Sequence, residues 1–235
     1  MTARPRISVV APCYNEAGNL AALLEAFAAA GRGEDFELVV VDNGSTDGTA
    51  AELARLLPRY PFARAVKVEE NRGYGFGILS GLAAASGGYV GWIHADLQFD
   101  PAAVFEAGRL LDEAGGKKVF AKGLRLGRPA PDRFFTAGMG LFETLLMGIR
   151  LRDISGQPTL FSRELLDAWK DPPHDFLLDL YACVTAARAG FREVRFGVRN
   201  LPRKHGISTW NRGFLDRLTL SRRIMTASLR MRFRS

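Results

Sequence analysis

Ten residues join a predicted strand to a predicted helix and decide the fold class, Trp92-Ile93-His94-Ala95-Asp96-Leu97-Gln98-Phe99-Asp100-Pro101. They begin inside an apolar run, residues 89–93, that is typical of a buried β-strand. Pro101 suits the first turn of a helix, and Asp100 suits the N-cap before it. That interpretation leaves Asp96 and Gln98 without a structural reason. Because Mg²⁺ takes oxygen ligands and is usually held by one or two carboxylates plus substrate phosphates, Asp96 and Gln98 are candidate metal ligands.

Strands and helices alternate in the same way along the first half of the chain. Strands are predicted at residues 7–11, 36–41, 65–68 and 89–93. Helices are predicted at residues 20–30 (with Asn19 as N-cap), 75–85 and 101–114, and in the segment that ends at residue 57. Continuously apolar strands that alternate with helices indicate an α/β fold, a mostly parallel sheet with helices on both faces. In such sheets ligands bind beyond the carboxyl ends of the strands, where the acidic turn lies.

The second half is less regular. Strands are predicted at residues 119–121 and 191–198, and helices at 134–149 and 176–189. No internal repeat or low-complexity linker divides the chain. We therefore expect one domain over residues 1–210 and a basic amphipathic C-terminal helix over residues 211–235.

Composition excludes several classes of protein. The chain has 235 residues, 47% of them hydrophobic, but no run of about 18 uncharged apolar residues that would span a bilayer. The N-terminus shows no signal-peptide core. Two cysteines, Cys13 and Cys183, fit neither a disulfide framework nor a zinc cluster, so we expect reduced thiols and a cytoplasmic protein.

Two loop motifs have a structural and a functional interpretation. The glycine-rich turn Asn71-Arg72-Gly73-Tyr74-Gly75-Phe76-Gly77 lacks the G-x-G-x-x-G spacing and follows the third strand, which argues against a nicotinamide cofactor. No Walker A sequence is present. Asp42-Asn43-Gly44-Ser45 is either a turn in which Ser45 or Thr46 caps the next helix, or a site where Asp42 contacts a ribose or base.

Three blocks together resemble family 2 nucleotide-sugar glycosyltransferases. They are Val9-Val10-Ala11-Pro12-Cys13-Tyr14-Asn15-Glu16, Val39-Val40-Val41-Asp42-Asn43-Gly44-Ser45-Thr46-Asp47-Gly48-Thr49 and Ala95-Asp96-Leu97-Gln98. Within that family the chain is most similar to the polyprenyl-phosphate sugar synthases, which include dolichol-phosphate mannose synthase. The resemblance covers residues 7–210 and implies the Rossmann-like GT-A fold and a nucleotide-sugar donor.

The resemblance also implies roles for individual residues. A nucleotide pocket would be lined by Pro12, Tyr14, Glu16, Asp42 and Asn43. Mg²⁺ or Mn²⁺ would be bound by Asp96 and Gln98. The acceptor phosphate would be met by Arg125, Arg133 and Thr136. A basic loop over the diphosphate would include Arg203, Lys204, His205 and Ser208.

Three positions depart from the family pattern. His94 stands where these enzymes usually carry an aspartate, and neutral imidazole suits softer metals than Mg²⁺. His94 is thus a candidate ligand that favours Mn²⁺, or a side chain that packs or hydrogen-bonds without ligating. Asn43 replaces a second acid and weakens one nucleotide or metal contact. Gln157 stands where the mannose synthases tend to carry an aromatic residue, which leaves the sugar and the base open.

The implied reaction is attack of an acceptor oxygen on the anomeric carbon, with inversion and loss of a nucleoside diphosphate. A lipid-phosphate acceptor is already anionic and needs no general base, whereas a hydroxyl acceptor needs a carboxylate. Asp179 is the candidate base for a hydroxyl acceptor. The competing interpretation of Asp179 is an exposed acid in the first turn of a helix, favoured by the helix dipole.

The C-terminal segment concentrates the positive charge. Residues 211–235 hold seven arginines and one acid, a net +6 out of +7 for the whole chain. Helical spacing aligns Phe214, Leu218, Met225 and Leu229 in one apolar stripe. Such a helix binds an anionic membrane surface or packs on its own domain. Binding to nucleic acid is a third alternative, which the nearly neutral charge of the rest of the chain disfavours.

The sequence therefore predicts a peripheral enzyme at the cytoplasmic face of the membrane that glycosylates a polyprenyl phosphate. The alternatives are transfer to a hydroxyl of a glycan or lipid-linked glycan, and a non-catalytic sugar-nucleotide-binding protein suggested by His94.

Overall fold

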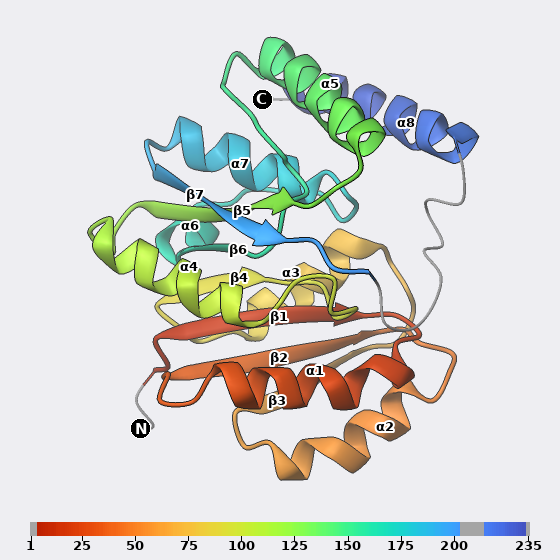
Figure 1. Cartoon of the computed structure of the whole chain (residues 1–235), viewed down its shortest axis with the longest axis vertical. Coiled ribbons are helices and arrows are strands. Elements are labelled where there is room, and N and C mark those ends of the chain that lie inside the picture. The colour runs from red at the N-terminus through yellow and green to blue at the C-terminus, as the bar shows by residue number, and fades with distance from the viewer. Residues whose placement is uncertain (1–3, 203–213, 234–235) are drawn as a thin grey trace.

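A seven-stranded mixed sheet with helices on both faces forms the body of the molecule (Figure 1). The computed structural model describes residues 4–202 and 214–233. The strands lie in the order β3-β2-β1-β4-β6-β5-β7. The mostly parallel sheet predicted from the sequence is confirmed.

The first half alternates strand and helix as predicted. Its elements are β1 (Ile7–Cys13), α1 (Ala17–Ala30), β2 (Phe36–Asn43), α2 (Thr49–Leu56), the 3-10 turn η1 (Leu57–Arg59), β3 (Ala63–Val68), α3 (Tyr74–Ala84), β4 (Tyr89–Trp92) and α4 (Ala102–Glu113). Strands β1 to β4 pair in parallel. One prediction at a helix end is wrong, because Asn19 lies buried inside α1, whose N-cap is Glu16.

The second half contains the antiparallel part of the sheet. Its elements are β5 (Val119–Leu126), α5 (Ala130–Met147), β6 (Thr159–Ser162), α6 (Glu164–Asp167), α7 (Leu178–Arg188), β7 (Arg192–Arg199) and α8 (Phe214–Phe233). Strand β6 runs antiparallel between β4 and β5. The sequence did not predict β6 because its four residues are all buried and show no alternation of apolar and polar side chains.

Apolar side chains of the strands serve two cores, one on each face of the sheet. Val9 belongs to the core beneath α1 and α4, whereas its neighbour Val10 belongs to the core beneath α3 and α7. This two-sided burial is why the strands read as continuous apolar runs. Helix α3 approaches β1 closely, since a Cβ on Gly81 would lie 2.3 Å from Val10 Cγ1.

Helix α8 packs against α5 at one end of the molecule (Figure 1). Ile224, Ala227 and Met231 are partly buried against the second core. Ser228 is fully buried, and its Oγ donates a hydrogen bond to Glu143 Oε1 at 2.7 Å. In this part of the chain α8 packs on its own domain, which is one of the alternatives considered for the C-terminal segment. Over the residues described, no helix is long and apolar enough to cross a membrane.

Candidate active site

The loops that follow β1, β2 and β4 meet at one edge of the sheet. The register places Cys13 opposite Asp42 on neighbouring parallel strands. The Ile93 N–H donates to the Val10 carbonyl at 3.0 Å, which brings the acidic turn after β4 to the same edge. Burial raises the pKa of the Cys13 thiol well above its usual value, and nearby carboxylates including Asp42 and Asp96 add to the shift. The structure therefore brings Asp42 and Asp96 to the edge where Tyr14 follows β1, and the roles of these residues remain predictions.

The β1 and β2 loops form the predicted nucleotide side of this edge. Tyr14 is 43% exposed, and Pro12 and Glu16 are half-buried. Asp42 is 4% exposed, and its Oδ1 accepts a hydrogen bond from the Ser45 N–H at 3.0 Å. These contacts fix the loop and leave an aromatic face open to solvent.

Asn43 joins β2 to the start of α3. Its Nδ2 donates to the Gly73 carbonyl at 3.0 Å, and its side chain is buried. The glycine at position 77 makes room for this amide, because a Cβ there would lie 3.0 Å from Asn43 Nδ2. The role of Asn43 in nucleotide binding remains a prediction, and its observed contact is a tie between two elements.

The acidic turn after β4 holds a buried carboxylate. Asp96 is 3% exposed, and its Oδ1 accepts from the Gln98 N–H at 3.1 Å. Leu97 between them adopts φ +58°, a conformation that few non-glycine residues take. Asp100 Oδ1 accepts from the Ala102 N–H at 2.9 Å, but the N-cap of α4 is Pro101, so the predicted N-cap at Asp100 is one residue too early.

This turn fits a cation that is shared with a substrate. Within the described ranges no cluster of three His, Cys, Asp or Glu side chains could hold a metal alone. Asp96 offers one hard oxygen donor within a group of carboxylates, and Gln98 is half-buried beside it. A partial oxygen set of this kind suits Mg²⁺ or Mn²⁺ that completes its coordination with a diphosphate.

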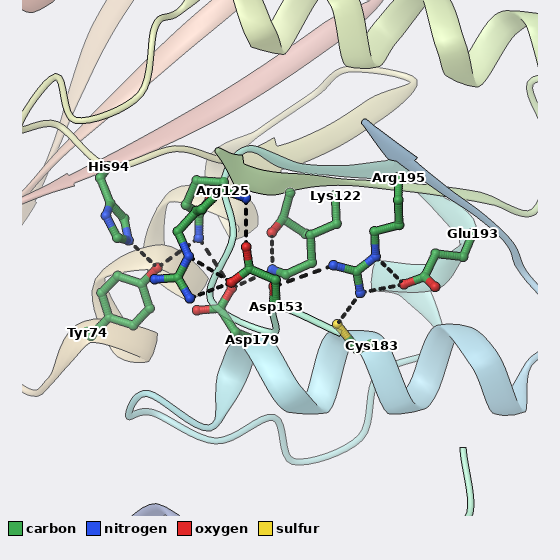
Figure 2. Close-up of polar contacts among 11 residues, drawn as sticks. Tyr74, His94, Lys122, Arg125, Asp153, Asp179, Cys183, Glu193 and Arg195 are labelled. Atoms are coloured by element: carbon green, nitrogen blue, oxygen red, sulfur yellow. Dashed lines mark hydrogen bonds and ion pairs between the residues drawn. The ribbon is translucent and has the colours of Figure 1, made fainter. Parts of the chain in front are cut away.

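His94 is hydrogen-bonded beside the turn. Its Nε2 lies 3.1 Å from Tyr74 Oη (Figure 2). Its ring packs edge-on against Tyr74 and Phe99. Burial lowers the pKa of His94, so the imidazole is neutral near pH 7. The contact is the hydrogen-bonding alternative considered for His94, and metal ligation by its other nitrogen remains a prediction.

A buried polar network continues from Tyr74 into the second half of the chain (Figure 2). Gln157 Nε2 lies 3.4 Å from Tyr74 Oη and 3.3 Å from Asp179 Oδ1. Lys122 Nζ donates to the same Asp179 oxygen at 2.8 Å and to Thr159 Oγ1 at 2.6 Å. Both unusual residues, His94 and Gln157, are thus partners of one tyrosine hydroxyl.

The interpretation of Asp179 as an exposed helix acid is wrong. Its side chain is 5% exposed and forms an ion pair with Lys122, whose side chain is completely buried. A sequence gap of 57 residues separates the two, so no local pattern reveals the pair. Sequence reasoning missed Lys122 and Thr159 in this network.

A cavity of about 480 Å³ lies between the end of β5, helix α5 and the loop before β6. Its lining residues are Leu124, Arg125, Arg128, Arg133, Thr136, Ala137, Gly140, Leu141, Thr144, Arg150, Leu151, Arg152 and Asp153. The three residues predicted to meet the acceptor phosphate, Arg125, Arg133 and Thr136, therefore share one cavity. We call this cavity the arginine pocket.

Five arginines and one acid line the arginine pocket. Arg125 Nε donates to Asp153 Oδ1 at 2.7 Å, and its backbone N–H donates to Oδ2 at 2.7 Å. Arg128 Nη1 donates to Thr136 Oγ1 at 2.6 Å. Sequence reasoning missed Arg128, Arg150 and Arg152. The two arginines just after the predicted helix 134–149, Arg150 and Arg152, were the sequence feature that could have revealed a basic site there.

The predicted basic loop of Arg203, Lys204, His205 and Ser208 lies outside the described residues. The predicted domain boundary at residue 210 falls in the same segment and stays a prediction.

Comparison with known proteins identifies relatives of the chain. The family model "Glycosyl transferase family 2" matches residues 8–169. An uncharacterised glycosyltransferase of Mycobacterium tuberculosis is 33% identical over 207 residues, which cover 86% of this chain and 88% of that protein. The undecaprenyl-phosphate 4-deoxy-4-formamido-L-arabinose transferase of Edwardsiella ictaluri is 40% identical over 99 residues. That match covers 40% of this chain and only 30% of the transferase.

A solved structure shares the fold over nearly the whole chain. Glucosyl-3-phosphoglycerate synthase of Mycobacterium tuberculosis, solved with Mn²⁺, UDP and glucosyl-3-phosphoglycerate, superposes with a TM-score of 0.71 and 25% identity. The superposition covers 97% of this chain and 80% of that one. With the converging loops of β1, β2 and β4, these matches confirm the GT-A fold, and the chain belongs to glycosyl transferase family 2 as a glycosyltransferase.

Proposed function

We propose that this glycosyltransferase moves a sugar from a nucleotide diphosphate to a polyprenyl phosphate, as a peripheral protein at the cytoplasmic face of the membrane. The observation that carries the proposal is the arginine pocket, which combines clustered guanidinium groups with an apolar wall. Arginine binds phosphate through paired N–H donors, and the apolar wall suits the first isoprene units of a lipid. The undecaprenyl-phosphate transferase among the relatives supports the same acceptor class.

The donor would bind at the opposite side of the site. Tyr14, with Pro12 and Glu16, offers a surface for the base, and Asp42 lies beside it. Asp96 and Gln98 would hold Mg²⁺ or Mn²⁺ together with the diphosphate of the donor. Once bound, the metal supplies charge neutralisation on the leaving diphosphate.

The reaction forms one bond and breaks one. A phosphate oxygen of the acceptor forms a bond to the anomeric carbon from the face opposite the diphosphate, which inverts the configuration. The bond from that carbon to the diphosphate breaks, and the nucleoside diphosphate leaves with the electron pair. An ionised phosphate carries no proton on the attacking oxygen, so the step needs no general base.

The environment of Asp179 supports this acceptor over a hydroxyl acceptor. A general base must reach the proton that it removes. The Asp179 carboxylate is almost fully buried, and its Oδ1 accepts from both Lys122 and Gln157. Asp179 is therefore better suited to hold Lys122 and Gln157 in place than to remove a proton from a hydroxyl acceptor.

A small phosphorylated acceptor is the second candidate. Its supporting observation is the likeness to glucosyl-3-phosphoglycerate synthase, because the same arginines would bind a soluble phosphate. The two candidates differ in their use of the apolar wall at Leu141 and Leu151.

The test is a transfer assay with radiolabelled nucleotide sugars, Mn²⁺ or Mg²⁺, and either a prenyl phosphate or 3-phosphoglycerate. We expect label in the organic phase with the prenyl phosphate. We also expect Arg133→Ala to raise the KM for the prenyl phosphate about tenfold or more while the KM for the donor stays unchanged, because the lost contact is a charge-assisted hydrogen bond.

Arg188→Ala, an exposed arginine on α7 away from the arginine pocket, is the matched control. Label that enters only phosphoglycerate would establish the second candidate. A donor KM that rises with the acceptor KM in Arg133→Ala would contradict the assignment of the pocket to the acceptor.

A further inference from the structure

The outward face of α5 carries large apolar side chains in solvent. Phe134, Leu141 and Leu145 are 82%, 61% and 76% exposed. Their spacings of seven and four residues place them on one side of the helix. The exposed residues between them are Ala137 and Gly138, so this side has no charge over three turns. We call these five residues the α5 stripe.

Three large apolar side chains exposed side by side on one helix mark a contact with a partner or a membrane. Helix α8 does not supply that contact, because α8 packs on the other side of α5. Ile224, Ala227 and Met231 of α8 face the core, and Ser228 bonds to the buried Glu143.

The α5 stripe is continuous with the arginine pocket. Ala137 and Leu141 belong to both, since they line the pocket and are exposed. Arg133 borders the stripe at its N-terminal end, and Arg150 and Arg152 follow it after the helix ends. All three are exposed, and no carboxylate in the described parts of the chain pairs with them.

We propose that the α5 stripe enters the surface of an anionic bilayer, with the arginine pocket held at the level of the lipid phosphates. The inference rests on the proposed function and adds the membrane-binding face and its orientation. A helix with an apolar side flanked by arginines lies in the membrane interface, where the arginines meet anionic headgroups. The acceptor phosphate then reaches the pocket past Leu141 while its isoprenoid chain stays in the bilayer.

The C-terminal helix was predicted to make this contact. In the described part of α8, Leu229 is 41% exposed and Met225 is half-buried, whereas Phe134 and Leu145 of α5 are exposed by more than three quarters. We therefore assign the main apolar membrane contact to α5 instead of α8, and α8, which packs on α5, contributes the exposed Arg222 and Arg230.

The test compares binding of the full chain to phosphatidylcholine vesicles with and without about 30% phosphatidylglycerol. We expect the unaltered chain to float with the anionic vesicles and Phe134→Gln/Leu145→Gln to lose about tenfold in affinity. Neither residue lines the arginine pocket. Transfer to a short, water-soluble prenyl phosphate should therefore be unchanged, and transfer to a vesicle-bound polyprenyl phosphate should fall.

The matched control is Ala29→Gln/Ala54→Gln, which makes two exposed changes on α1 and α2 at the opposite end of the molecule (Figure 1). This control should bind vesicles like the unaltered chain. Equal binding by the α5 variant, or no binding by the unaltered chain, would overturn the inference. A dimer in sedimentation velocity that Phe134→Gln/Leu145→Gln dissociates would also overturn it, because the stripe would then bind a second copy.

The assay separates this inference from the proposed function. If vesicle binding depends on the stripe but no prenyl phosphate accepts sugar, the membrane face stands and the acceptor assignment fails. If prenyl phosphate accepts sugar but the stripe has no effect on vesicle binding, the acceptor stands and the membrane face fails.

Discussion

At the scale of single residues, the buried ion pair of Lys122 and Asp179 holds the side chains at the centre of the site in position. The ammonium lies 5.8 Å from the centre of the Trp92 ring and is fully enclosed. Removing one charge of a buried pair leaves the other without compensation. The pair therefore fixes the position of Asp179, and through Gln157 the position of Tyr74.

We expect Lys122→Met to lower the free energy of unfolding by about 3–5 kcal/mol, measured by urea denaturation. The double variant Lys122→Met/Asp179→Leu should recover most of the loss, because neither charge is then buried. Lys67→Met, which removes the exposed pair with Glu69, is the control and should leave the stability unchanged. A double variant no more stable than Lys122→Met would contradict this account.

The Tyr74 hydroxyl links the two residues that depart from the family pattern. In Tyr74→Phe both His94 Nε2 and Gln157 Nε2 lose a partner. We expect the donor KM to rise several-fold with an unchanged acceptor KM, because His94 lies two residues from Asp96, and the stability to fall by about 1 kcal/mol. Tyr181→Phe is the control, since its hydroxyl bonds only to the backbone of Lys170 in the contacts shown.

Tyr181→Phe should lose comparable stability and keep both KM values. A parallel rise of donor and acceptor KM in Tyr74→Phe would indicate general loosening of the site instead of a specific role beside the donor.

At the scale of elements, much of the first half could be predicted because each strand and helix is specified locally. The β1, β2 and β4 strands are apolar runs that end in polar turns, and the alternation with helices indicates that they run parallel. The second half depends on contacts distant in the sequence. Strand β6 pairs with β4 and β5 across long gaps, and Asp179 is buried only because Lys122 reaches it. Local patterns cannot carry that information.

The contact of α5 with α8 contains a titratable group. Burial raises the pKa of Glu143, and the hydrogen bond from Ser228 opposes the shift only in part. A carboxyl group whose pKa is raised in the folded state favours folding at low pH. That contribution is complete below the unfolded pKa near 4.5 and is lost as the pH rises through the folded pKa.

We therefore expect Glu143→Gln to raise the free energy of unfolding at pH 7 by about 1 kcal/mol, with the gain vanishing near pH 4. Chemical denaturation at both pH values measures the difference. Glu106→Gln, an exposed acid on α4, should show no such gain at pH 7. A gain of equal size at both pH values would exclude titration of Glu143 as its cause.

At the scale of the whole molecule, the proposed donor and acceptor sides lie on different halves of the chain. The β1, β2 and β4 loops form the proposed donor side, and β5, α5 and the loop before β6 form the arginine pocket. His94 lies near both, because the charges of Asp96 and Arg125 both influence its pKa. The proposed transfer of a sugar from one phosphate to another requires the donor and acceptor sites to meet in this way.

The donor side can be tested without knowing the sugar. Binding of a nucleoside diphosphate with Mn²⁺ should raise the melting temperature by about 5 °C at saturating ligand, since binding to the native state alone stabilises it. Asp96→Asn should lose the part of the shift that depends on Mn²⁺ and retain the part caused by the nucleotide at Tyr14 and Asp42. Asp100→Asn changes an acid in the same turn whose Oδ1 accepts from the Ala102 N–H, a hydrogen bond that the asparagine amide oxygen can also accept, so it should keep both its melting temperature and the full Mn²⁺-dependent shift. Equal loss of that shift in both variants would mean that the turn acts through its fold and not through the Asp96 carboxylate.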